Sequence, residues 1–203
     1  MAFNVNNFRS ALPGGGARAN LFEVRIPNPA GLSGLPDVQK NIRLLCQTAS
    51  IPTGTIEQTE LNYFGRVYKI AGTRTFEDWE TTVLNDEDFA IRRWAEIWMD
   101  KINGNTSNIA ATANPNEYMV DATVVQFGKN GDPIREYAML GCWPTTVAAI
   151  ELDWSTNNEV ENFAITWAYT SWESVDMDEK AFGFSGEIKL PVLGGISLSL
   201  IHI

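Results

Sequence analysis

Three consecutive carboxylates stand just before a tryptophan-rich segment, in the stretch "NDEDFAIRRWAEIWMDKING". Together, Asp86, Glu87 and Asp88 could bind a metal ion or supply a general acid and base. The start of a helix would also account for them, because unpaired backbone N–H groups and the helix dipole both favour negative charge there. In that case Asn85 or Asp86 is the N-cap, and Asp88 lies in the first turn.

The residues after the triplet favour the helix. Arg92 and Glu96 form an i,i+4 pair on its polar side, and Gly104 follows as a stop signal. Apolar side chains recur at the spacing of one helix face; they are Ile91, Trp94, Ala95, Trp98 and Ile102. The sequence therefore predicts a capped helix rather than a metal or acid–base site.

Two further candidates for catalysis have ordinary explanations. Glu77, Asp78 and Glu80 imitate a glycosidase carboxylate pair. Strand alternation, however, puts Asp78 and Glu80 on the face opposite Trp79, as expected for a half-exposed strand. The single histidine, His202, stands one residue from the end of the sequence, where a catalytic triad would lack a rigid support. We therefore expect no enzyme, no metal site and no cofactor.

Composition excludes some classes of function. The chain has 203 residues, 44% apolar and 20% charged, which suits one domain with extensions. Its net charge of −10 argues against a protein that grips nucleic acid through a basic patch. Cys46 and Cys142 fit no metal-binding spacing, and we interpret them as buried free thiols rather than a disulfide. No stretch is apolar enough to predict a signal peptide or a membrane span.

The remaining patterns predict a mostly β fold, antiparallel, with one flanking helix. "IRLLCQTASIP" is interpreted as a buried strand, and Gly72 as a turn between two strands. Asn130-Gly131 predicts a hairpin turn. A second hairpin is expected to place Ile150, Leu152 and Trp154 inward and Glu151 and Asp153 outward, with a return strand over residues 163–169. The aromatic residues expected in the core are Trp79, Trp94, Trp98, Trp154 and Trp167.

Two long stretches resemble a known family. They are "YFGRVYKIAGTRTFEDWETTVLNDEDFAIRRWAEIWMDKIN" and "YAMLGCWPTTVAAIELDWSTNNEVENFAITWAY". Their order, a G-x-R-T-F-E-D-W strand, an N-D-x-D-F helix start, then G-C-W-P and a closing hairpin, is similar to that of tail tube proteins of contractile-tailed bacteriophages. The resemblance covers roughly residues 20 to 172. We expect a flexible arm at residues 1–20, where the three glycines of "PGGGARAN" prevent regular structure, a tube domain at 21–180 and a C-terminal strand extension at 181–203.

The resemblance implies two packed antiparallel sheets that join between subunits into six-membered rings, stacked as a hollow tube. Partners would be further copies, the tail sheath and the baseplate, with double-stranded DNA passing through unbound. The protein would belong to the virion tail and assemble in the host bacterial cytoplasm. The arm and the hairpin tip at Tyr63, Phe64, Gly65 and Arg66 would reach neighbouring subunits.

Charge supports a conduit for DNA. Six copies at −10 each would carry about −60 per ring, and acidic walls would repel the phosphate backbone. Glu151 and Asp153 are the candidate lumen-facing residues. Related tubes occur in bacteriocins and in type VI secretion, and both remain open. Two alternative hypotheses come from other classes of function: a β-sandwich carbohydrate-binding module, and a hydrolase that uses Glu77, Asp78 or Glu80.

Overall fold

The computed structural model describes residues 4–110, 112 and 114–176. Two antiparallel sheets share one long strand, β7 (Pro133–Val147). Its first part pairs with β6 (Val120–Phe127) on one side and β9 (Ser171–Asp176) on the other, and β1 (Phe22–Arg25) flanks β6. Its last part pairs with β8 (Asn162–Ala168), followed by β5 (Trp79–Leu84) and β2 (Cys46–Ala49). The predicted fold class is confirmed.

The switch between the two sheets occurs at Gly141. Pairing of β7 with β6 ends at Cys142, and pairing with β8 begins at Trp143. Gly141 has a φ of 66°, in the left-handed region where a side chain would be strained. Its N–H donates to the Asp121 carboxylate at 3.0 Å. This glycine therefore lets a single strand bend from one sheet into the other.

A tryptophan cluster joins helix α3 (Ala90–Ile102) to the sheets. Trp94 and Trp98 of α3 lie with ring centroids 5.9 and 5.8 Å from Trp167 of β8, and Trp79 of β5 lies 6.4 Å from Trp167. Each indole N–H donates to a protein oxygen, which removes the cost of burying it. The acceptors are Ser50 for Trp79, Asn28 for Trp94, Tyr118 for Trp98 and Thr81 for Trp167. The predicted core positions of these four tryptophans are confirmed.

The remaining helices are short. They are α1 (Val5–Ala11), the 3₁₀ turn η1 (Pro13–Gly15), α2 (Gln39–Leu45) and α4 (Pro115–Tyr118). The expected lack of regular structure in the glycine segment is wrong only for the 3₁₀ turn η1, in which Gly14 has non-helical φ and ψ, and helix α1 lies before that segment. Asn4 caps α1 by accepting a hydrogen bond from the N–H of Asn6. None of the α1 residues is buried, and the arm as a separate unit stays a prediction. In the described ranges no helix is long and apolar enough to cross a bilayer.

One strand prediction is wrong in part, since only Cys46–Ala49 of the predicted segment is a strand, and a predicted turn is wrong. The segment read as a buried strand from Ile42 onward begins as helix α2, because a short apolar run does not distinguish a helix from a strand. Gly72 lies within the continuous strand β4 (Arg66–Thr75), not in a turn. Gly72 and Thr73 together oppose the single residue Glu57 of β3 (Thr55–Tyr63), and a Cβ on Gly72 would lie 3.1 Å from the Glu57 carbonyl oxygen. The glycine is needed for a close approach between strands.

The predicted strand around Trp154 is also wrong. Residues 148–161 form a loop between β7 and β8, and Trp154 is fully exposed (101%) instead of lying in the core. The Asp153 carboxylate accepts hydrogen bonds from the Ser155 N–H at 2.9 Å and the Ser155 hydroxyl at 2.8 Å. Such local bonds compete with strand pairing. The alternation of residues 150–154 therefore does not produce a buried face.

Candidate assembly interface

The candidate catalytic carboxylates lie on the surface of the molecule. Glu77, Asp78 and Glu80 are exposed at the start of β5, whereas Trp79 between them is buried. His202 and the C-terminal extension at 181–203 lie outside the described residues. Within the residues that the structure describes, no group of three or more His, Cys, Asp or Glu side chains is arranged to hold a metal ion. These carboxylates lie where a half-exposed strand would place them.

The acidic triplet lies in a turn before α3, not in its first helical turn. The helix begins at Ala90, after Phe89 in a left-handed conformation. The carboxylate of Asp86 accepts a hydrogen bond from the Ala90 N–H at 2.9 Å, so it satisfies a helix N–H as expected, though from four residues away. The expected placement of Asp88 in the first turn is wrong. Asn85 is not the cap, since Phe89 occupies the N-cap position and the Asn85 amide donates to the Glu161 carboxylate.

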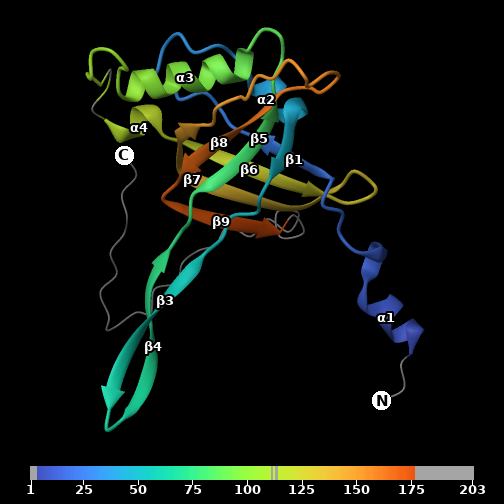
Figure 1. The fold of residues 1–203 in the computed structure, drawn as a ribbon. Helices are drawn as coiled ribbons and strands as arrows, with labels where there is room; N and C mark the ends of the chain where they lie inside the picture. The colour runs from blue at the N-terminus through green and yellow to red at the C-terminus, as the bar shows by residue number, and fades with distance from the viewer. Residues whose placement is uncertain (1–3, 111, 113, 177–203) are drawn as a thin grey trace, which may run out of the picture.

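The hairpin of β3 and β4 projects away from the two sheets, at the lower end of the molecule (Figure 1). Every residue of both strands is exposed. Directly paired residues of an antiparallel hairpin share a face, and alternate positions along each strand return to it. The register therefore places several apolar side chains on one face of the hairpin: Leu61, Tyr63, Tyr68 and Ile70. The opposite face carries the Lys69–Glu60 ion pair at 3.3 Å.

The tip of this hairpin is a two-residue turn formed by Phe64 and Gly65. Both have positive φ, 44° and 82°, which matches the twist of the flanking strands and usually requires Asn or Gly. A phenylalanine in this conformation is strained, and its ring is 90% exposed. It contacts the Tyr63 ring edge-on, with centroids 4.5 Å apart. Neither folding nor burial accounts for an aromatic residue here, which points to a role in binding.

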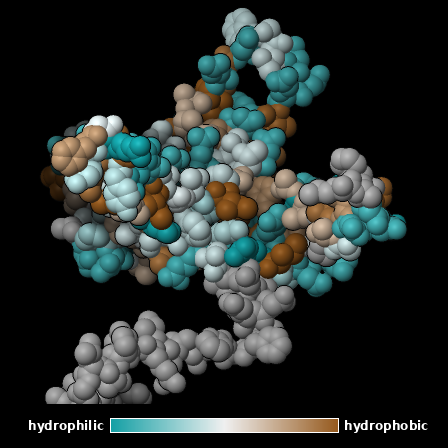
Figure 2. Space-filling model, turned by 90° about the horizontal axis from the view of Figure 1, so that it is seen from below, coloured by the Kyte–Doolittle hydropathy of each residue, from teal (hydrophilic) through white to brown (hydrophobic). Residues whose placement is uncertain are grey.

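The surface around the hairpin is mixed in character. Seen from that end, hydrophobic and hydrophilic side chains are interspersed, and the brown areas are interrupted by teal ones (Figure 2). Interfaces between proteins commonly combine apolar contacts with a polar surround.

The loop at residues 148–161 forms a second exposed surface, beside α3. Arg92 of α3 donates to the Ala148 carbonyl at 2.8 Å, and the Asn85 amide donates to the Glu161 carboxylate at 3.0 Å. Between the two limbs of the loop lies an open hollow of about 340 Å³, and Glu151, Glu159 and Glu161 line it. Its lining includes no Lys or Arg. Turn signals such as Asp153-x-Ser155 and Asn157-Asn158 could have revealed this loop.

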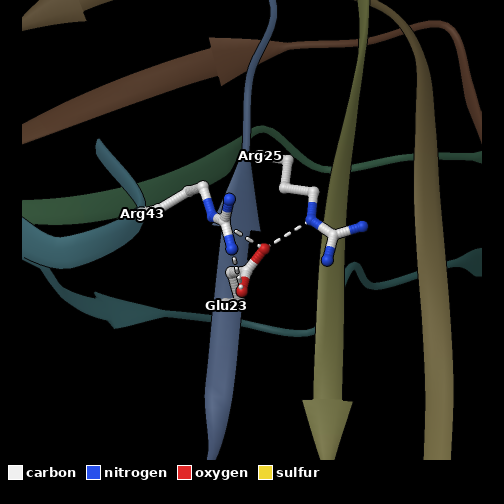
Figure 3. Close-up of polar contacts among 3 residues, drawn as sticks. All are labelled: Glu23, Arg25 and Arg43. Atoms are coloured by element: carbon white, nitrogen blue, oxygen red, sulfur yellow. Dashed lines mark hydrogen bonds and ion pairs between the residues drawn. The ribbon is translucent and has the colours of Figure 1, made fainter. Parts of the chain in front are cut away.

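Glu23 lies between two arginines, a grouping that the sequence did not suggest (Figure 3). Arg43 of α2 approaches both of its carboxylate oxygens at 3.0 Å, and Arg25 of β1 pairs with it as well. Burial acts to raise the pKa of this carboxyl, but the hydrogen bonds from Arg25 and Arg43 outweigh it and leave the pKa lowered. The cluster ties α2 to the edge strand β1.

The two cysteines are free thiols, as expected. Burial raises the pKa of Cys46 to about 12, and burial followed by the nearby Asp121 raises that of Cys142. Cys142 is buried and Cys46 only half-buried. Thiols of this kind are poor nucleophiles at neutral pH, because the reactive thiolate is scarce.

The proteins of similar sequence are all named as tail tube proteins. The family model "Phage tail tube protein" matches residues 17–175. The chain is 33% identical over 158 residues to the tail tube protein gp19 of Enterobacteria phage T4, covering 77% of this chain and 91% of the relative. It is 30% identical over 167 residues to the tail tube protein of Serratia phage KSP90, covering 81% and 93%.

Solved structures of low sequence identity share the fold. A chain in the anti-feeding prophage baseplate superimposes with a TM-score of 0.55 at 13% identity, covering 79% of this chain and 95% of that one. A chain in the sheath–tube complex of an extracellular contractile injection system gives 0.51 at 12% identity, covering 86% and 99%. Since the family match extends over most of the sequence and over both sheets, this chain belongs to the phage tail tube protein family.

Proposed function

We propose that the protein forms the inner tube of a contractile phage tail. Copies would assemble into six-membered rings, the rings would stack into a hollow tube, and double-stranded DNA would leave the virion through it. The tail sheath and the baseplate would be the other protein partners. Support comes from phage relatives at 30–33% identity that are named tail tube proteins. We place the protein in the virion tail, assembled in the host cytoplasm, and assign it no catalytic activity.

The unpartnered apolar face of the β3–β4 hairpin is the observation that carries this proposal. A two-stranded hairpin is at best marginally stable alone in water and gains stability when an apolar face is packed. Leu61, Tyr63 and Tyr68 are exposed on that face of a hairpin whose strands are 9 and 10 residues long. Within a tube, a neighbouring copy would cover them.

The open edges of the sheets support lateral assembly. Strands β1 and β2 end a path of six paired strands, and β9, off this path, pairs only with β7. Edge strands leave backbone N–H and C=O groups free to pair with another chain, and closing strands into a ring removes such edges. We expect neighbouring subunits to continue the sheets around the ring.

Charge supports the role of a conduit. At −10 per copy, the lining of a tube would repel DNA rather than adsorb it. The orientation of Glu151 and Asp153 toward the lumen stays a prediction, although the strand argument for it no longer holds.

The test is negative-stain electron microscopy of the concentrated full-length protein near neutral pH, alone and with purified tail baseplates. The wild type should form stacked rings or hollow tubes. Tyr63→Ser should reduce assembly strongly, because it removes an aromatic ring from the apolar hairpin face. Ile109→Ser, an equally exposed apolar residue in the loop after α3, is the matched control and should assemble normally. A wild type that stays monomeric even with baseplates would contradict the proposal.

A further inference from the structure

The loop at residues 148–161 has the composition of a docking surface. Its exposed apolar side chains include Leu152, Trp154 and Val160. Tryptophan is enriched among the residues that contribute most to binding between proteins, and a fully exposed one gains nothing from the fold. The four charged residues of the loop are all acidic: Glu151, Asp153, Glu159 and Glu161. A partner for this surface would bring aromatic or apolar groups together with positive charge.

The hairpin tip has the complementary character. In the stretch "LNYFGRVY", residues 61–68, Arg66 is the single charged residue. It pairs across the hairpin with Tyr63, next to the exposed ring of Phe64. A guanidinium suits carboxylates because it donates several hydrogen bonds in a planar fork, and it also stacks on aromatic rings. The 148–161 loop offers both kinds of contact, because carboxylates line its hollow and the ring of Trp154 is exposed on the same loop.

The two surfaces lie at opposite ends of the molecule. The hairpin tip points down in Figure 1, whereas the orange loop between β7 and β8 lies at the top, next to the N-terminal end of α3. One copy therefore cannot bring its own two surfaces together. A contact between unlike surfaces on two copies repeats head to tail and produces an open stack rather than a closed pair.

We propose that the hairpin tip of one copy docks on the 148–161 loop of a copy in the adjacent ring. Arg66 enters the acidic hollow, and Phe64 packs against Trp154. This inference rests on the proposed tube function and adds to it the pair of surfaces that joins successive rings. It also places Glu151 and Asp153 at the junction between successive rings.

Cross-linking in assembled tubes tests the contact. Asn62→Cys and Asn157→Cys, combined in the full-length chain, place thiols beside the contact without removing Phe64, Arg66 or Trp154. A short bis-maleimide should then yield a ladder of covalent multimers extending past the size of one ring. The single-cysteine variants and the wild type, with its poorly reactive Cys46 and Cys142, are controls. Asn62→Cys with Ile109→Cys combines the hairpin thiol with a thiol outside the proposed contact. This variant should give no ladder.

A charge exchange tests the chemistry. Arg66→Glu should shorten tubes at least tenfold, and adding Glu159→Arg should recover much of their length. Arg74→Glu, at the base of the same strand, is the matched control and should leave tube length unchanged.

The outcomes separate the two proposals. If the wild type forms tubes but the variant with both Asn62→Cys and Asn157→Cys gives no ladder, or a ladder that stops at the size of one ring, the docking contact is overturned and the tube function stays intact. Failure of the wild type to form tubes would overturn both. Wild-type tubes, a long ladder from the double-cysteine variant and recovered tube length in the Arg66→Glu, Glu159→Arg variant would establish the contact.

Discussion

The indole N–H of Trp167 donates to the hydroxyl of Thr81 at 2.9 Å, between two strands of one sheet and almost out of reach of solvent. Thr81 is 2% exposed and Trp167 1%. Trp167 is also the ring that both Trp94 and Trp98 of α3 approach. This hydrogen bond therefore satisfies a buried polar group at the centre of the core.

Removing the Thr81 hydroxyl should destabilise the fold. Thr81→Val leaves the Trp167 N–H buried without its acceptor, and we expect a loss of about 1–3 kcal/mol in the free energy of unfolding. Urea unfolding followed by tryptophan fluorescence measures it. Thr81→Ser keeps the hydroxyl and should lose clearly less. Equal losses for the two variants would mean that the hydrogen bond contributes no more than the methyl group that Thr81→Ser removes, and would contradict the prediction.

The Asp86 carboxylate should stabilise the start of α3. Asp86→Ala removes the acceptor of the Ala90 N–H, and the loss expected for a cap is about 0.5–2 kcal/mol. Asp88→Ala, in the same turn, is the matched control and should cost about 0.5 kcal/mol or less. Thermal and urea unfolding compare the two. A larger loss for Asp88→Ala would show that the field of the helix matters more than the hydrogen bond.

The Glu23 cluster should make stability depend on pH in the acid range. The folded-state pKa of Glu23 is lowered, so its stabilisation is present above the unfolded pKa of about 4.3 and is lost as the pH falls through the folded value. Both arginines are about half exposed, which limits the effect to about 1 kcal/mol or less. Unfolding of wild type and Glu23→Gln at pH 7 and pH 3 tests this. The difference between them should shrink at pH 3, and a constant difference would contradict it.

Phe64 should reduce the stability of its own turn. Phe64→Asn places at this positive-φ position a residue that tolerates it, so unfolding stability should stay the same or rise by a few tenths of a kcal/mol. Tube assembly should weaken, because the exposed ring is lost. Denaturant unfolding and electron microscopy of the same sample separate the two effects. Weaker folding with normal tubes would show that the ring serves the monomer instead.

Much of the secondary structure follows from local sequence. The helical stripe of α3, with Trp94 and Trp98, was predictable because a 3.6-residue period is strong over 13 residues. Asn130-Gly131 marks the β6–β7 turn, because Gly131 has the positive φ that such turns need. The sequence also predicts a hairpin with its tip at Tyr63–Arg66, but it does not show which surface this tip contacts.

Tertiary structure decided the rest. Whether Trp154 is buried depends on a strand partner for residues 150–154, and alternation alone does not supply one. The role of Gly72 depends on the backbone of Glu57 in the opposite strand. Glu57 is close to Gly72 in space, although no local sequence pattern links the two residues. The ion pair of Glu23 with Arg43 joins strand β1 to helix α2, two elements that no local pattern connects. Periodicity reports which faces are able to be buried, whereas pairing and packing determine which faces are buried.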